Sequence, residues 1–92
     1  MATFIIGYDI HPSRGESYDK LWEGIKTLGA WWHHLDSTWL VKSQLTAVQI
    51  RDRLWKLLPY NDDQLLVVNV SGDEAAWQGF DDSGSEWIKE NL

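Results

Sequence analysis

The chain lacks cysteine and has only two prolines among its 92 residues. Without cysteine it forms no disulfide and offers no thiolate as a metal ligand or nucleophile. No long apolar run is present, and Met1–Phe4 does not begin a basic region followed by an apolar core, so we expect neither an export signal nor a membrane span, and a cytoplasmic location. The size, with 43% hydrophobic residues and seven tryptophans, fits one domain spanning residues 1–92.

Basic residues are few, eight against 14 acidic ones, and the excess acid is confined to one end of the chain. Residues 1–60 carry seven basic and six acidic side chains, a net charge of +1, whereas residues 61–92 carry eight acidic side chains and Lys89, a net charge of −7. The acidity therefore belongs to the C-terminal part, and charge neither excludes nor supports a phosphate-binding face on the remainder.

The first half of the chain alternates apolar runs with turn residues. The continuous run Thr3–Ile10 predicts a central strand covered on both faces, ending at His11–Pro12. Apolar residues at helical spacing from Tyr18 to Leu28 predict a helix that Gly29 terminates. The segments 31–35 and 38–42 flank Asp36 and Ser37 and predict a hairpin.

The second half adds a helix, a strand and a helical tail. Thr46 and Gln49 fit a capping box, and the helix that follows must end near Pro59. Leu65–Val70 predicts a buried fourth strand, and residues 74–77 and 85–90 predict two short helices. The order indicates an α+β fold, a ferredoxin-like βαββαβ sandwich whose first and third strands are central. Both main helices then cover one sheet face, and the acidic helical tail, residues 73–92, a partner subunit or a ligand covers the other.

Asp9 is the candidate site residue, because it comes at the exit of an apolar strand and precedes a loop. A carboxylate there suits Mg²⁺ or Mn²⁺, and in a two-fold homodimer the same aspartate from each subunit could meet at the axis. The structural alternative is that Asp9 accepts hydrogen bonds from loop amides and merely ends the strand.

The adjacent pair His33 and His34 suggests a metal or a general base. Neighbouring strand residues point to opposite faces, so the two rings do not chelate one ion easily. One ring could lie on the open side of the sheet beside Asp9 and move a proton, but packing or hydrogen bonding is the more ordinary role.

The aromatic and basic residues allow two interpretations. Burial in the core or the hairpin explains the tryptophans at positions 22, 31, 32, 39 and 55. The functional alternative is that they stack on nucleic-acid bases. Arg51, Arg53 and Lys56 on the second helix could touch phosphates, although a solvated helix face has the same spacing.

Several short motifs also carry a family resemblance. The strand Phe4–Ile10, a loop with Arg14 and the segment Leu35–Val41 resemble the first two-thirds of the small CRISPR-associated endonucleases that partner the CRISPR integrase. The whole chain resembles more closely the SinR-like family of small bacterial proteins, on the motifs GYD, WWH, LDSTW, AVQIRD and AAWxGFDD. An acidic helical tail stands where the endonucleases have a further strand. Many of them have several arginines in the loop after the first strand, and here that loop has only Arg14.

The resemblance implies a ferredoxin-like homodimer with Asp9 at its axis, binding a divalent metal for phosphodiester hydrolysis of RNA or DNA. His11 and Arg14 would then be loop contacts to nucleic acid, with Arg51 and Arg53 as further phosphate contacts. The competing hypothesis is a non-catalytic module whose acidic segment, Asp73 to Leu92, binds a basic protein or mimics nucleic acid. In that case deletion of residues 73–92 abolishes partner capture and leaves the fold intact, whereas unfolding would mark the tail as structural.

Overall fold

The computed structural model describes residues 1–9, 15–58 and 63–92. Within them the chain forms a four-stranded antiparallel sheet and three helices, an α+β architecture. In chain order the elements are β1 (Ala2–Asp9), α1 (Gly15–Lys26), β2 (Ala30–Leu35), β3 (Thr38–Ser43), α2 (Ala47–Trp55), β4 (Gln64–Asn69) and α3 (Asp82–Asn91). The sheet order is β2-β3-β1-β4, so β1 and β3 are central, as expected from the sequence.

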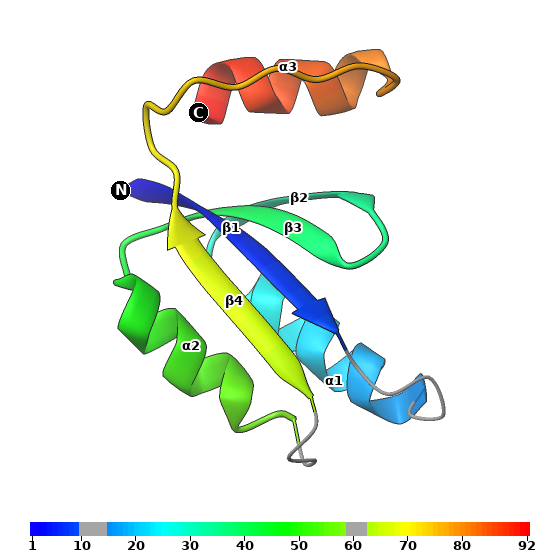
Figure 1. The fold of residues 1–92 in the computed structure, drawn as a ribbon, viewed down its shortest axis with the longest axis vertical. Coiled ribbons are helices and arrows are strands. Elements are labelled where there is room, and N and C mark those ends of the chain that lie inside the picture. Colours follow the sequence, from blue (N-terminus) through cyan, green and yellow to red (C-terminus); the bar gives the residue numbers. More distant parts are fainter. Residues whose placement is uncertain (10–14, 59–62) are drawn as a thin grey trace.

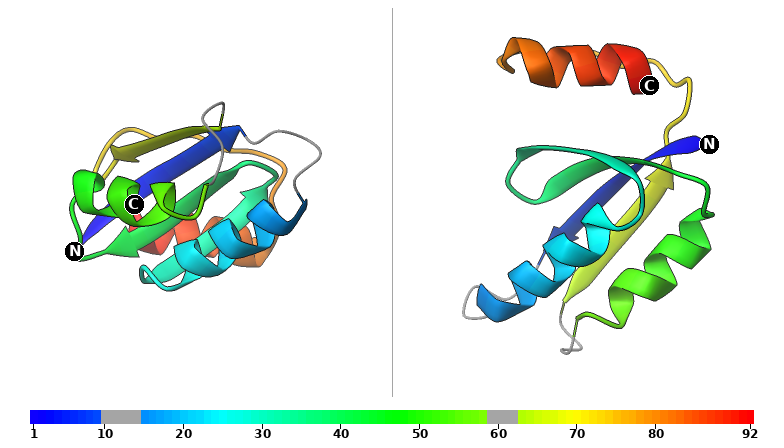
Figure 2. Two further views of the ribbon diagram at one scale, coloured as in Figure 1. Left: turned by 90° about the horizontal axis from the view of Figure 1, so that it is seen from below. Right: turned by 180° about the vertical axis from the view of Figure 1, so that it is seen from behind.

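The helices lie on both faces of this sheet. Figures 1 and 2 show α1 and α2 on one face, which we call the helix face, and α3 on the opposite side, which we call the tail face. Residues of β1 alternate between them: Phe4, Ile6 and Tyr8 are buried against the helices, whereas Ile5 packs with the tail. This two-residue period is the pattern of a strand with two covered faces.

The main core lies on the helix face. Leu21 and Ile25 of α1 and Ile50 and Leu54 of α2 are fully buried there, at the spacing that places them on one side of each helix. Trp39 of β3 is equally buried. Burial of these apolar side chains therefore holds α1 and α2 against the sheet.

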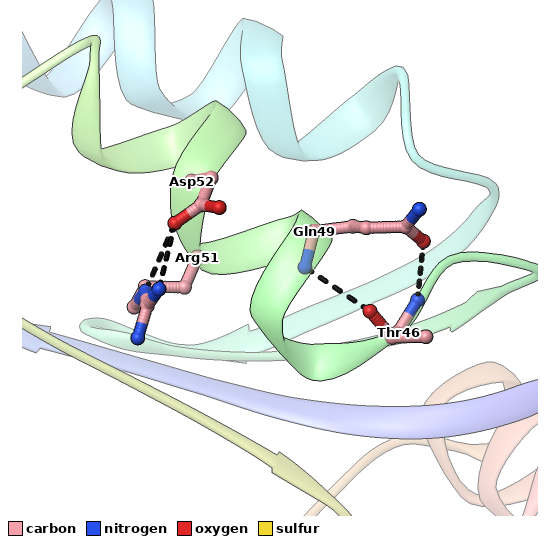
Figure 3. Close-up of polar contacts among 4 residues, drawn as sticks. All are labelled: Thr46, Gln49, Arg51 and Asp52. Atoms are coloured by element: carbon pink, nitrogen blue, oxygen red, sulfur yellow. Dashed lines mark hydrogen bonds and ion pairs between the residues drawn. The ribbon is translucent and has the colours of Figure 1, made fainter.

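Local signals set the helix ends. The side chain of Thr46 accepts a hydrogen bond from the Gln49 backbone N–H at 3.2 Å, and the Gln49 side chain accepts from the Thr46 N–H at 2.9 Å, which confirms the capping box (Figure 3). Gly29 follows α1 with a φ of +154°. A Cβ at Gly29 would lie 2.0 Å from the Lys42 carbonyl oxygen, so only glycine lets β3 pass this close.

The tail packs on the other face through aromatic and aliphatic side chains. Trp32, Leu40 and Ile88 are buried there, and Trp77, Phe80 and Trp87 pack around them. The Trp32 indole N–H donates to the Gly84 carbonyl at 3.1 Å, and the Thr3 hydroxyl donates to the Asn91 carbonyl. The two ends of α3 are thus attached to β2 and β1, and the tail is part of the fold.

Three predictions about the elements need correction. Residues 74–77 form an irregular segment and not a helix, and Trp77 packs together with Phe80 against the buried cluster on the tail face. β4 is an edge strand with an exposed face, and its apolar composition does not make it buried. The cover over β1 is partial, since Gly7 and Asp9 extend beyond α3.

The second main helix ends at Trp55, and Pro59 lies outside the described residues. Within the described ranges, every helix is too short or too polar to cross a lipid bilayer.

Candidate functional site

Asp9 lies at the last position of central strand β1, and its side chain is exposed. It pairs with Gln64 across the β1–β4 ladder, and Gly7 pairs with Leu66 in the same ladder. Figure 1 shows α3 over the β2–β3 side of the sheet, so the end of β1 and the neighbouring strand β4 are left uncovered on the tail face. We call the uncovered part the open face; it consists of Gly7, Asp9, Gln64, Leu66 and Val68.

The open face is apolar apart from its edge. Leu66 is 62% exposed and Val68 is 39% exposed, although both are large aliphatic residues. An added Cβ at Gly7 would meet nothing within 4 Å, so the surface beside Asp9 is flat and accessible. A shallow depression of about 250 Å³ runs over Gly7, Asp9, Gln64 and Leu66. The two exposed aliphatic side chains leave apolar area on the open face that a second surface would bury on contact.

Asp9 of one chain offers a metal ion a single carboxylate. Over the described ranges, no group of three or more histidine, aspartate or glutamate side chains lies close enough together to hold an ion. Mg²⁺ is nevertheless held in many proteins by one or two carboxylates, with water and substrate phosphates completing the octahedron. Two copies of Asp9 brought together at a two-fold axis would supply two carboxylates, so a dimer would improve the fit.

The loop contacts expected beside Asp9, His11 and Arg14, lie outside the described residues.

The two arginines predicted to contact phosphate differ in their surroundings. The Arg51 guanidinium donates to the Asp52 carboxylate at 2.8 Å, and both side chains are more than half exposed (Figure 3). Arg53 instead lines a depression of about 360 Å³ with Lys42, Gly29 and Ala30. We call this depression the basic groove, because its charged side chains are Lys42 and Arg53. Sequence reasoning did not single out Lys42, since only the fold places it on the same depression as Arg53.

An exposed aromatic residue lies near this groove on the same strand as Ala30. Trp31 is 42% exposed, and the Lys26 ammonium lies 5.3 Å from its ring centroid. By contrast Trp32 and Trp39 are buried, as the burial interpretation predicted, whereas burial does not explain Trp31 or Trp55, which is 43% exposed. A partly exposed indole beside a lysine suits stacking on a nucleic-acid base.

The two adjacent histidines face opposite sides of the sheet, as expected. His33 stacks on Trp39 with ring centroids 3.9 Å apart, on the helix face, and its Nε2 lies 3.2 Å from the Asp36 carbonyl oxygen. Because a carbonyl only accepts, this nitrogen carries the proton. His34 contacts Trp32 and Phe80 on the tail face. Both rings therefore have packing partners, which is the ordinary role considered above.

The tail, residues 73–92, carries several acidic side chains. Six are exposed: Asp73, Glu74, Asp81, Asp82, Glu86 and Glu90. Asp81 caps α3 by accepting from the Gly84 N–H at 2.8 Å, and this bond, with a second from Ser83, holds the pKa of Asp81 below its usual range. The solvent-exposed surface of the tail is therefore acidic.

Comparison of the chain with protein-family models, with curated proteins and with solved structures finds no match.

Proposed function

We propose that the protein is a ferredoxin-like homodimer that acts on nucleic acid, with two copies of Asp9 meeting at the dimer axis to bind Mg²⁺ or Mn²⁺ for phosphodiester hydrolysis. The observation that carries the proposal is the exposed Asp9 at the end of a central strand, next to exposed aliphatic residues that the tail leaves uncovered. The strand order β2-β3-β1-β4, with α1 and α2 on one face, supports the ferredoxin-like plan.

The open face supports pairing through a two-fold axis. In such an interface the same surface is used twice, so Leu66 of one copy is buried near the axis together with its equivalent. Burial of these aliphatic side chains favours association, and the flat surface at Gly7 allows the two sheets to approach. Asp9 lies at the edge of this surface, which lets two carboxylates meet without being enclosed in an apolar interior.

The basic groove supports nucleic acid as the substrate. Lys42 and Arg53 line it, and Lys26 lies over the exposed indole of Trp31. Cations that alternate with a stacking surface bind the phosphates and bases of single strands. A bound divalent ion would stabilise charge on the scissile phosphate and lower the pKa of its water. The two Asp9 carboxylates would orient that ion, and the basic groove would hold the strand.

The test combines oligomeric state with cleavage. We expect light scattering to give a dimer, and Leu66→Lys to give a monomer because it places a charge at the interface. Val48→Lys is the matched control, since Val48 is a similarly exposed aliphatic residue on α2, away from the open face. The wild type should cut single-stranded RNA or DNA with Mg²⁺ or Mn²⁺ and not with EDTA, and Asp9→Asn should abolish cleavage and leave the dimer intact.

Other results would reject the proposal in part or in full. If the protein is a monomer at every concentration, a metal site shared between two subunits is ruled out. A dimer that cuts neither nucleic acid, or an Asp9→Asn variant that cuts as fast as the wild type, removes the hydrolytic function.

A second candidate is a non-catalytic module that binds a basic protein through the tail. It is favoured by the six exposed carboxylates between Asp73 and Glu90. The aromatic residues of the tail pack on the sheet, so the carboxylates are the groups left to contact a partner. Because the tail packs on the sheet, charge neutralisation is a cleaner test than deletion. Glu86→Gln with Glu90→Gln should weaken capture of a basic partner while the thermal midpoint stays unchanged.

A further inference from the structure

A cavity of about 490 Å³ lies between the tail face of the sheet and the chain that follows β4. We call it the tail cavity. Its floor comes from Ile5 and Leu40 of the sheet, and its walls come from aromatic residues of β2 and the tail, namely Trp32, Trp77 and Phe80. The volume is in the range of pockets that hold small organic ligands.

The aromatic walls present carbon surfaces to the cavity. The Trp32 indole N–H is engaged by the Gly84 carbonyl at 3.1 Å, and the Trp77 indole N–H is engaged by the Ser85 hydroxyl at 3.3 Å. Phe80 packs edge to face against Trp32, with ring centroids 4.9 Å apart, which fixes both rings. The walls thus offer π surfaces and few hydrogen-bond donors, a setting that attracts cations.

The charged side chains that line the cavity have one sign. They are Asp73 and Glu74, and no basic side chain joins them among the described lining residues. Asp73 is held by a turn in which its N–H donates to the Val70 carbonyl at 3.1 Å. Ser71 in the same turn accepts from the Thr3 N–H at 2.7 Å, so the turn is attached to β1. The carboxylate of Asp73 is therefore carried by a fixed backbone at the cavity.

We propose that the tail cavity binds a small organic cation with an apolar body, such as a substituted aryl or alkyl ammonium compound. The apolar body fills the space between Ile5, Leu40 and Trp77, and the cationic group lies near the aromatic faces and the carboxylates of Asp73 and Glu74. Burial of the body supplies most of the affinity, and the carboxylates select the sign of the charge. This site is separate from the hydrolytic function proposed for Asp9.

Three probes of matched shape test the proposal: phenyltrimethylammonium, the neutral isostere tert-butylbenzene, and the anion benzenesulfonate. Binding is followed by NMR on the indole N–H signals of Trp32 and Trp77, which report on the cavity itself. We expect the cation to shift both signals in a saturable way and to bind roughly tenfold more tightly than the anion.

Two kinds of variant assign the effect to this site. Asp73→Asn with Glu74→Gln should weaken binding of the cation roughly fivefold and leave binding of tert-butylbenzene unchanged. The matched control, Glu86→Gln with Glu90→Gln, makes the same change in net charge at exposed positions of α3 that do not line the cavity, and should leave both affinities unchanged. Thr38→Phe fills the cavity from β3 and should remove binding of every probe, and Ala76→Phe fills it from the tail if the first variant does not fold.

Several outcomes overturn the inference. Equal binding of cation and anion shows a purely apolar cavity, and the absence of any saturable shift shows that the cavity takes no such ligand. If the Glu86 and Glu90 control weakens binding of the cation as much as the Asp73 and Glu74 variant does, the preference for the cation comes from the net charge of the protein and not from a site.

Discussion

The indole N–H of Trp39 donates a hydrogen bond to the hydroxyl of Tyr8 at 3.2 Å, and Tyr8 in turn donates to the Asp36 carbonyl at 3.1 Å. Trp39 is fully buried, so the Tyr8 oxygen satisfies a donor that water does not reach. Trp22 of α1 donates to the same oxygen at 2.7 Å. One hydroxyl therefore joins β1, α1 and the β2–β3 hairpin.

Tyr8→Phe should lower the free energy of unfolding by about 1–3 kcal/mol, because it leaves the Trp39 N–H buried without its acceptor and changes almost no apolar volume. Urea denaturation followed by circular dichroism measures the change. Trp55→Phe is the control, since Trp55 is 43% exposed and should cost less. Equal stability of Tyr8→Phe and the wild type would show that the hydroxyl contributes nothing net.

Gly29→Ala should destabilise the fold by about 3 kcal/mol or more, because the new Cβ would collide with the Lys42 carbonyl oxygen and Gly29 also has a positive φ. Gly7→Ala is the matched control. Gly7 has nothing within 4 Å of an added Cβ, so alanine there creates no clash within one chain and should lower the thermal midpoint far less than Gly29→Ala. If both variants melt alike, the close approach of Lys42 is not what selects glycine at position 29.

Asp81 should make α3 sensitive to acid. Hydrogen bonds from Gly84 and Ser83 lower the pKa of Asp81 in the folded protein, so its contribution to stability is complete above the unfolded pKa and is lost as the pH falls through the folded pKa. We expect the Trp32 indole signal, which depends on the Gly84 carbonyl, to change in that acidic range. Asp81→Asn keeps a cap and should flatten this pH response, whereas Asp81→Ala should loosen α3 at every pH.

Asp82→Asn provides the comparison for this measurement, because Asp82 lies in the first turn of α3 and the capping acceptor is Asp81. A pH response that disappears in Asp82→Asn and persists in Asp81→Asn would contradict the assignment.

Much of the fold could be predicted from short-range patterns. The hairpin around Asp36 and Ser37, the capping box at Thr46 and the stop at Gly29 all depend on residues close in sequence, and the structure has each of them. The irregular segment at residues 74–77 was missed because its conformation is set by Trp77 and Phe80 packing on the sheet, a contact that no local pattern contains.

The candidate sites were predictable only in part. Asp9 is a candidate from the sequence alone because a carboxylate after an apolar strand is visible there, and Arg53 is one because it lies on a predicted helix. Lys42 and the tail cavity could not be predicted from the sequence. Lys42 and Arg53 line one depression, and Asp73, Trp77 and Leu40 line one cavity, only after the chain folds.

Ile88→Ala should destabilise the protein by about 2–4 kcal/mol, because Ile88 is buried against Trp32 and Leu40 and its loss leaves a cavity under α3. Glu90→Ala on the same helix is exposed and should change the free energy of unfolding by less than about 0.5 kcal/mol. Thermal unfolding measures both. A mild effect of Ile88→Ala would mean that the tail contributes little to the fold and is free to serve a partner.

Arg53→Gln and Arg51→Gln separate the basic groove from the rest of α2. Arg53 lines the groove with Lys42, whereas Arg51 is paired with Asp52 at 2.8 Å, so removal of Arg53 should weaken binding of single-stranded nucleic acid more. We expect the Arg53 variant to reduce the slope of log affinity against log salt by about one, and the Arg51 variant to change it less. Fluorescence anisotropy with a labelled oligonucleotide at several salt concentrations gives both slopes. If the two arginines lower affinity equally, the contact is the general charge of the helix, and the groove loses its role in the proposed function.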